Sequence, residues 1–263
     1  MPDGPLLEIS HLTKRFGGLL AVSDVSFTIG QGEILSMIGP NGAGKTTAFN
    51  CVTGLFPITS GDIRLDGLSI SGLPPHRITK LGIARTFQNI RLFAFMTALD
   101  NVMVGAHWWM KERVWDGAFQ TPRARHEERT VQEWAFSLLD QLGIVRYAGS
   151  YARELPYGLQ RRLEIARALA THPRLLLLDE PAAGLNPQEK NELMALIARL
   201  CSEGLTVFLI EHDMRVVMEV SDRIVVLDHG EKIAEGKPVE VRENPRVIEA
   251  YLGTGASQEM PTA

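Results

Sequence analysis

The segment that most constrains the fold of this 263-residue chain is a glycine-rich run at residues 39–47: Gly39-Pro40-Asn41-Gly42-Ala43-Gly44-Lys45-Thr46-Thr47. It matches the pattern G-x-x-x-x-G-K-[ST] at every constrained position, and it stands between an apolar run at 34–38 and a helix-like run at 48–52. Glycines let backbone amides converge on one anion, and the start of a helix adds the positive end of its dipole. The pattern therefore predicts a phosphate-binding loop between a buried strand and a helix.

Two residues of this loop carry specific chemistry. Lys45 can reach the β- and γ-phosphates of a bound nucleotide, and the Thr46 hydroxyl is a suitable ligand for Mg²⁺. A glycine-rich turn without a ligand is the alternative interpretation, but the flanking strand-like and helix-like runs disfavour it. We therefore expect the chain to bind a nucleoside triphosphate together with Mg²⁺.

The composition narrows the class of protein. Hydrophobic residues make up 45% and charged residues 22% of the chain, as in ordinary globular domains. The net charge of −4 does not suggest a basic surface, so nucleic acid is not an expected partner. We expect Cys51 and Cys201 to be buried free thiols on helices. We find no secretion signal in residues 1–20 and no apolar run of membrane-spanning length, so we expect membrane association only through a protein partner.

Hydrophobic patterns predict an α/β core. Short alternating strands within 6–30, and a strand closed by the Asp66-Gly67 turn, predict an antiparallel β part. Apolar runs at 175–178, 207–210 and 223–227 predict a mostly parallel central sheet with right-handed crossovers.

A different pattern occupies residues 89–158, which we interpret as a helical sub-domain inserted into this core. Helical spacing relates Trp134, Leu138, Leu139 and Leu142, and the same stretch contains the other three tryptophans, Trp108, Trp109 and Trp115. The core is expected to resume with a helix from Gln160 to Thr171. We expect one domain over 6–253, made of a core (6–88 and 159–235), the insertion (89–158) and a C-terminal helical extension (236–253), followed by a disordered tail (254–263).

Acidic residues follow the apolar run at 175–178. Asp179 is suited to hold Mg²⁺ through water, and Glu180 is suited to orient or deprotonate an attacking water. His212 follows the next predicted parallel strand, so it should lie on the same sheet edge and sense the γ-phosphate. Gln88 stands at the start of the helical insertion, where its amide oxygen could contact Mg²⁺ while its backbone acts as a hinge.

With these residues assembled, the chain resembles an ATP-binding-cassette ATPase over about residues 6–253. The motifs that carry the resemblance occur in the family's order: the loop 39–47, Gln88, Leu155-Pro156-Tyr157-Gly158-Leu159-Gln160-Arg161-Arg162, Asp179-Glu180-Pro181 and His212. Within the family the chain is most similar to the larger ATPase subunits of high-affinity branched-chain amino acid importers. The details that point there include Arg15-Phe16-Gly17-Gly18, Thr47-Ala48-Phe49-Asn50, Ala182-Ala183-Gly184-Leu185-Asn186-Pro187 and Asn244-Pro245.

The resemblance implies an α/β P-loop nucleoside triphosphatase with a RecA-like core, a mostly parallel central sheet, an N-terminal antiparallel β sub-domain and an inserted helical sub-domain. It implies that Phe16 stacks on adenine with Val22 packed nearby, and that Gly158 contacts the nucleotide held by a partner subunit. Where the family has Leu-Ser-Gly-Gly-Gln, this chain has Leu155-Pro156-Tyr157-Gly158-Leu159. The serine hydroxyl is absent and Pro156 has no N–H, so we expect a weak contribution across the dimer.

The resemblance also implies partners and a location. The implied partners are a second ATPase subunit, identical or different, two polytopic membrane permease subunits and, indirectly, an extracytoplasmic solute-binding protein. The implied location is the cytoplasmic face of the inner membrane, where the chain would be peripheral. Three alternatives remain open: the ATPase of another transporter (for urea, amides, lipid or lipopolysaccharide), a soluble cassette ATPase acting on DNA or ribosomes, and a small-molecule kinase or GTPase. The absence of long heptads and of a second cassette disfavours the soluble ATPase.

Overall fold

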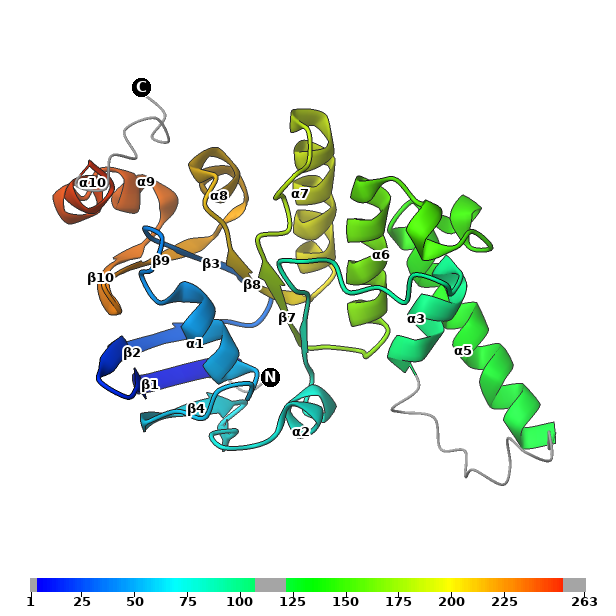
Figure 1. Cartoon of the computed structure of the whole chain (residues 1–263), viewed down its shortest axis with the longest axis horizontal. Helices are drawn as coiled ribbons and strands as arrows, with labels where there is room; N and C mark the ends of the chain where they lie inside the picture. Colours follow the sequence, from blue (N-terminus) through cyan, green and yellow to red (C-terminus); the bar gives the residue numbers. More distant parts are fainter. Residues whose placement is uncertain (1–3, 107–121, 253–263) are drawn as a thin grey trace. The chain divides into compact units, whose positions relative to one another are not determined.

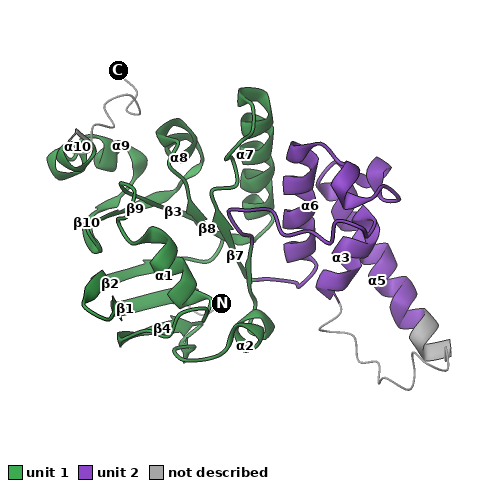
Figure 2. Ribbon diagram, in the orientation of Figure 1, with its two compact units in different colours: residues 1–85, 174–263 green, residues 86–173 purple. Residues whose placement is uncertain are grey.

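The computed structural model describes residues 4–106 and 122–252 (Figure 1). The expectations for Trp108, Trp109, Trp115 and the tail 254–263 therefore lie outside the described residues. The chain forms two compact units, one made of residues 1–85 and 174–263 and the other of residues 86–173 (Figure 2). No helix among the described residues has both the length and the apolar character needed to cross a membrane.

The first unit contains a four-stranded antiparallel sheet. Its strand order is β2 (Leu19–Ile29), β1 (Leu7–Phe16), β4 (Ser60–Leu65) and β5 (Leu68–Ser69). The β4–β5 hairpin turns at Asp66 and Gly67, whose φ angles are +52° and +76°. Both central residues of a tight hairpin turn adopt positive φ, which the Asp-Gly pair tolerates well. The predicted antiparallel β part is confirmed.

The second sheet of this unit has six strands and contains the central strands of the fold. Its order is β10 (Glu231–Gly236), β9 (Arg223–Asp228), β3 (Ile34–Ile38), β8 (Thr206–Ile210), β7 (Leu175–Asp179) and β6 (Ile83–Arg85). All neighbours are parallel except β10, which pairs antiparallel with β9. Every residue of β3, β7 and β8 is buried, as expected for strands covered on both faces. The predicted α/β class and mostly parallel sheet are confirmed.

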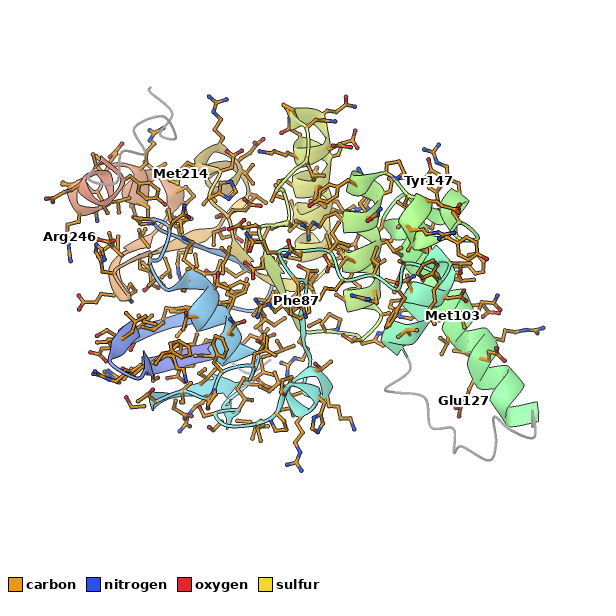
Figure 3. The ribbon with its side chains drawn as sticks, in the orientation of Figure 1. Phe87, Met103, Glu127, Tyr147, Met214 and Arg246 are labelled. Carbon is orange, nitrogen blue, oxygen red and sulfur yellow. The ribbon has the colours of Figure 1, made fainter. Side chains whose placement is uncertain are left out.

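Helices cover the six-stranded sheet on both faces. Helix α1 (Lys45–Val52) joins the antiparallel sheet and the central strands in one hydrophobic core, in which the Phe49 and Phe208 ring centroids lie 4.5 Å apart. A second core cluster joins β9 to α8 (Met214–Val220), α9 (Pro238–Arg242) and α10 (Pro245–Leu252), with Met214 buried in it (Figure 3). These last two helices lie in the segment expected to be a helical extension.

Helix α2 (Pro75–Lys80) precedes β6, and helix α7 (Pro187–Ser202) lies between β7 and β8. A capping box starts α7. The Asn186 side chain accepts a hydrogen bond from the Glu189 backbone, and the Glu189 carboxylate accepts one from the Asn186 backbone. Cys51 in α1 and Cys201 in α7 are buried free thiols, as expected, and burial raises the pKa of each to about 11.

The second unit is helical. It consists of α3 (Ala98–Ala106), α5 (Pro122–Gln141), η2 (Val145–Tyr147), η3 (Ala152–Glu154) and α6 (Tyr157–Leu169). Leu138, Leu139 and Leu142 are buried as their spacing predicts, and the Trp134 ring stacks on His172 with 4.6 Å between centroids.

Two boundaries in this unit differ from those expected from the sequence. The unit spans residues 86–173 instead of 89–158, because α6 packs against α3 and α5 and so belongs with the insertion. Helix α6 also runs from Tyr157 to Leu169, whereas a helix from Gln160 to Thr171 was expected. Pro156 is the N-cap and provides the carbonyl that accepts the Gln160 amide. Gly158 therefore lies inside the first turn of the helix, not before it.

Candidate nucleotide-binding site

The glycine-rich loop connects the end of β3 to the start of α1, as the pattern predicts. Gly39, Gly42 and Gly44 have φ angles of +148°, +83° and +98°, which L-residues with side chains rarely adopt. A Cβ atom at Gly39 would collide with the Leu227 carbonyl, and one at Gly44 with the Ala21 carbonyl. The backbone must therefore approach its neighbours closely here, and the first-turn amides of α1 have no acceptor within the helix. This geometry is a cradle for an anion.

Lys45 lies within this cradle. Its Nζ atom donates to the carbonyl oxygens of Gly39 at 2.6 Å and Pro40 at 2.9 Å, and the residue is 8% exposed. Burial lowers the pKa of Lys45, while the negative charges of Glu180 and Asp179 act in the opposite direction. Thr46 is exposed at the first turn of the helix. The carboxylates of Glu180 and Asp179 therefore lie close enough to stabilise the charged form of Lys45.

The predicted adenine-stacking residue lies at the turn between β1 and β2. Phe16 is 40% exposed, and its ring meets the edge of Phe56 at 5.2 Å between centroids. The Lys14 ammonium lies 4.6 Å from the Phe16 ring centroid. Val22 is fully buried on β2, close to Gly44. An exposed aromatic ring thus lies at the end of the hairpin that packs against the loop.

Asp179 ends β7 and is buried, but it is not alone there. Its Oδ2 atom lies 2.7 Å from Nη2 of Arg85 at the end of β6. The other terminal nitrogen of Arg85 donates to Asn50 Oδ1 on α1 at 2.5 Å and to Thr53 Oγ1 at the C-cap of α1 at 3.3 Å. Arg85 therefore ties the aspartate to the helix that begins at the phosphate loop. The sequence analysis did not identify Arg85, although its position three residues before Gln88 was a signal.

Glu180 follows in a left-handed backbone conformation, with φ +48°. Its amide donates to the Ile210 carbonyl at 2.9 Å, which connects it to the end of β8. His212 Nδ1 lies 3.8 Å from Glu180 Oε2 and 3.9 Å from Glu211 Oε2. Glu180 and His212 thus lie close together at one edge of the sheet, because parallel strands present their carboxyl ends together.

Glu211 is a second residue that the sequence analysis missed. Its carboxylate is fully buried and accepts the Ala182 amide at 2.8 Å. Burial raises the pKa of Glu211, the hydrogen bond from Ala182 opposes that rise, and the nearby Glu180 charge adds to it. A glutamate between an apolar strand and a histidine was a visible signal. Glu211 holds the chain that leaves Glu180, and so helps to fix the direction of that carboxylate.

The residues present suit Mg²⁺ by their chemistry. Thr46 offers a hydroxyl oxygen and Asp179 a carboxylate oxygen, and hard oxygen ligands are those that Mg²⁺ prefers. Arg85 engages Oδ2 of Asp179, which leaves Oδ1 available to a metal-bound water. Gln88 and Gly158, the other two predicted site residues, belong to the helical unit. Gln88 is exposed, and its backbone carbonyl accepts a hydrogen bond from Arg161 at 2.9 Å.

Comparisons with known proteins agree with this geometry. Residues 22–183 match the family model of the ABC transporter ATP-binding domain, and residues 231–257 match the model for branched-chain amino acid ATP-binding cassette transporters. The high-affinity branched-chain amino acid transport ATP-binding protein BraF of Pseudomonas aeruginosa is 54% identical over 250 residues, which are 95% of this chain and 98% of BraF.

Solved structures of ABC transporter cassettes are also similar to this chain. The ADP conformation of MJ1267, an ATP-binding cassette of an ABC transporter, is 31% identical with a TM-score of 0.84, covering 95% of this chain and all of that one. The dimeric bacterial ABC transporter cassette MJ0796 is 28% identical with a TM-score of 0.75, covering 88% of this chain and 98% of that one.

A phosphate cradle at the end of one parallel strand, with an aspartate, a glutamate and a histidine at the ends of two others, defines a nucleoside triphosphatase. Within that class, the chain belongs to the ATP-binding-cassette ATPases of ABC transporters.

Proposed function

We propose that this chain is the ATP-hydrolysing subunit of an importer of branched-chain amino acids. The observation that carries the ATPase part is the grouping of Lys45, Asp179, Glu180 and His212 at one edge of the parallel sheet. The transported class rests on the similarity to BraF and on the match of residues 231–257.

The chain's own residues divide the work. The amides of residues 39–47 and the Lys45 ammonium bind the triphosphate, and Phe16 stacks on the adenine beside Val22. Glu180 accepts the proton of the attacking water, and His212 holds the γ-phosphate in line. Thr46, Asp179 and Gln88 are the residues that would hold Mg²⁺, and the ion would neutralise charge on the transferred phosphoryl group.

The partners follow from the same proposal. A second ATPase subunit closes on this one, two polytopic permease subunits receive the motion, and an extracytoplasmic solute-binding protein delivers the solute, with the chain at the cytoplasmic face of the inner membrane. The dimeric cassette MJ0796 supports the first of these partners. In the closed dimer, Gly158 at the start of α6 faces the nucleotide held by the partner.

The altered signature segment makes the two sites of such a dimer unequal. Pro156 and Tyr157 stand where the family has serine and glycine, so the first turn of α6 lacks the serine hydroxyl. The helix still offers its N-terminal dipole and the Gly158 amide. If the second subunit has an intact signature segment, the site built on this chain's Lys45 and Glu180 is the faster one.

Three measurements test the proposal. Purified chain with Mg²⁺ should bind ATP, and the chain should co-purify with a polytopic membrane protein; association with nucleic acid instead would favour the soluble ATPase. Deletion of the gene should abolish high-affinity uptake of leucine, isoleucine and valine. Loss of urea, amide or lipid transport with normal leucine uptake would assign another transporter.

A further inference from the structure

The first turns of α6 contain an arginine that is completely buried. Arg161 has no exposed surface, and its Nη1 atom donates to the Phe87 carbonyl at 2.9 Å while Nη2 donates to the Gln88 carbonyl at 2.9 Å. A guanidinium is a rigid planar fork, so two bonds to successive carbonyls fix both the position and the orientation of that peptide segment.

A buried carboxylate completes the arrangement. Glu164 lies one turn further along α6, 1% exposed, with Oε2 at 2.9 Å from Arg161 Nη1. Its other oxygen accepts the Arg91 amide at 3.3 Å. A buried charge pair is tolerated when further hydrogen bonds compensate for the lost solvent. Here residues 87–91 bond the two terminal nitrogens of Arg161 and one oxygen of Glu164. The pair therefore holds this segment at three backbone atoms.

Tyr157 is a third side chain that takes part, together with Arg161 and Glu164. Its hydroxyl lies 3.3 Å from Arg161 Nη2, and its ring centroid lies 5.9 Å from the guanidinium carbon. Tyr157 is also one of the residues by which the signature segment departs from the family pattern. A glycine at this position could make neither contact. The tyrosine that replaces the family's glycine in this segment therefore contributes two contacts to Arg161.

We propose that Arg161 is a positioning residue that ties the backbone of Gln88 to the first turn of α6, so that the two move as one body. All the atoms concerned lie within the helical unit. The proposal rests on the proposed function, in which Gln88 meets Mg²⁺ and Gly158 faces the partner's nucleotide.

Hydrogen exchange measured by mass spectrometry on the full-length chain without nucleotide tests the tie itself. Arg161→Met combined with Glu164→Gln removes both charges together and avoids leaving one buried charge unpaired. We expect the amides of residues 87–92 to exchange at least about tenfold faster than in the wild type, with α3 and α5 unchanged. Arg161→Lys should give an intermediate increase, since one ammonium cannot replace a fork that spans two carbonyls.

Arg167→Met is the matched control. Arg167 lies on the same helix, and burial lowers its pKa. Its guanidinium lies over the Phe93 ring, with 5.6 Å to the ring centroid. This variant should leave the exchange of residues 87–92 within about threefold of wild type. Equal exchange of residues 87–92 in the wild type and the double variant would overturn the tie.

Addition of ATP and Mg²⁺ separates this tie from the proposed function. In the wild type we expect slower exchange at residues 39–47, and its absence would contradict the proposed function. The nucleotide-free comparison still decides whether Arg161 holds residues 87–92.

Discussion

Arg85 Nη2 lies 2.7 Å from Asp179 Oδ2, and both side chains are almost fully buried, at 8% and 4% exposed. The same guanidinium donates hydrogen bonds to Asn50 on α1 and to Thr53 at the C-cap of that helix. The aspartate proposed to bind Mg²⁺ is therefore braced against the helix that follows the phosphate loop. Movement of α1 relative to β7 would have to break hydrogen bonds of Arg85.

Arg85→Met should lower the free energy of unfolding and the apparent affinity for Mg²⁺. Removing one partner of a buried pair costs about 3–5 kcal/mol, because the other charge stays buried without compensation. We expect a lower urea midpoint and a higher Mg²⁺ concentration for half-maximal turnover. Arg64→Met is the control, since its pair with Asp62 is 51% and 30% exposed and should contribute at most about 1 kcal/mol. An unchanged Mg²⁺ requirement in a folded Arg85→Met chain would contradict the brace.

Lys45→Ala should remove most of the affinity for ATP. The ammonium is buried among the loop carbonyls and can exchange these for phosphate oxygens, and a hydrogen bond to a charged group contributes about 1.5–3 kcal/mol. We expect binding weaker by about 10- to 100-fold in calorimetric titration with Mg²⁺. Lys80→Ala, an exposed residue at the end of α2, should bind as the wild type does. Equal affinities for the two variants would refute the phosphate site.

Glu180→Gln should retain ATP binding and lose turnover. The amide has nearly the shape of the carboxylate but cannot accept a proton from water, and general-base catalysis contributes about 10²- to 10⁴-fold. Phosphate release by the assembled transporter measures this effect, with Glu231→Gln on exposed β10 as the control. If turnover of the assembled transporter is unchanged, Glu180 is not the base.

Glu211→Gln should alter how stability depends on pH. Burial raises the pKa of Glu211, so the folded chain binds more protons than the unfolded chain from about the ordinary pKa of 4.5 up to the raised value. Stability from this group therefore falls as pH rises through that window. Glutamine keeps an oxygen for the Ala182 amide and does not titrate, so the variant should gain stability relative to wild type as pH rises. Urea unfolding from pH 4.5 to 8 measures the difference, and a difference independent of pH would contradict this account.

Local patterns in the sequence were sufficient for much of the fold. The loop 39–47, the Asp66-Gly67 turn and the capping box of Asn186 and Glu189 each involve residues close in the chain, so spacing alone reports their geometry. The buried strands β7 and β8 were recognisable because burial on both faces leaves an uninterrupted apolar run. Parallel order then placed Glu180 and His212 at one edge.

Tertiary structure decided which charged residue meets which. Arg85 pairs with a residue 94 positions away, Arg161 with a carbonyl 73 positions away, and Glu211 with an amide 29 positions away. No periodicity relates such partners, since each contact depends on how separate strands and helices pack. The same reason moved the unit boundary to 173, because a helix joins the neighbours on which it buries its apolar face. The sequence by itself determined the local geometry of the phosphate loop, and packing determined the charged contacts that hold the acidic side chains around it.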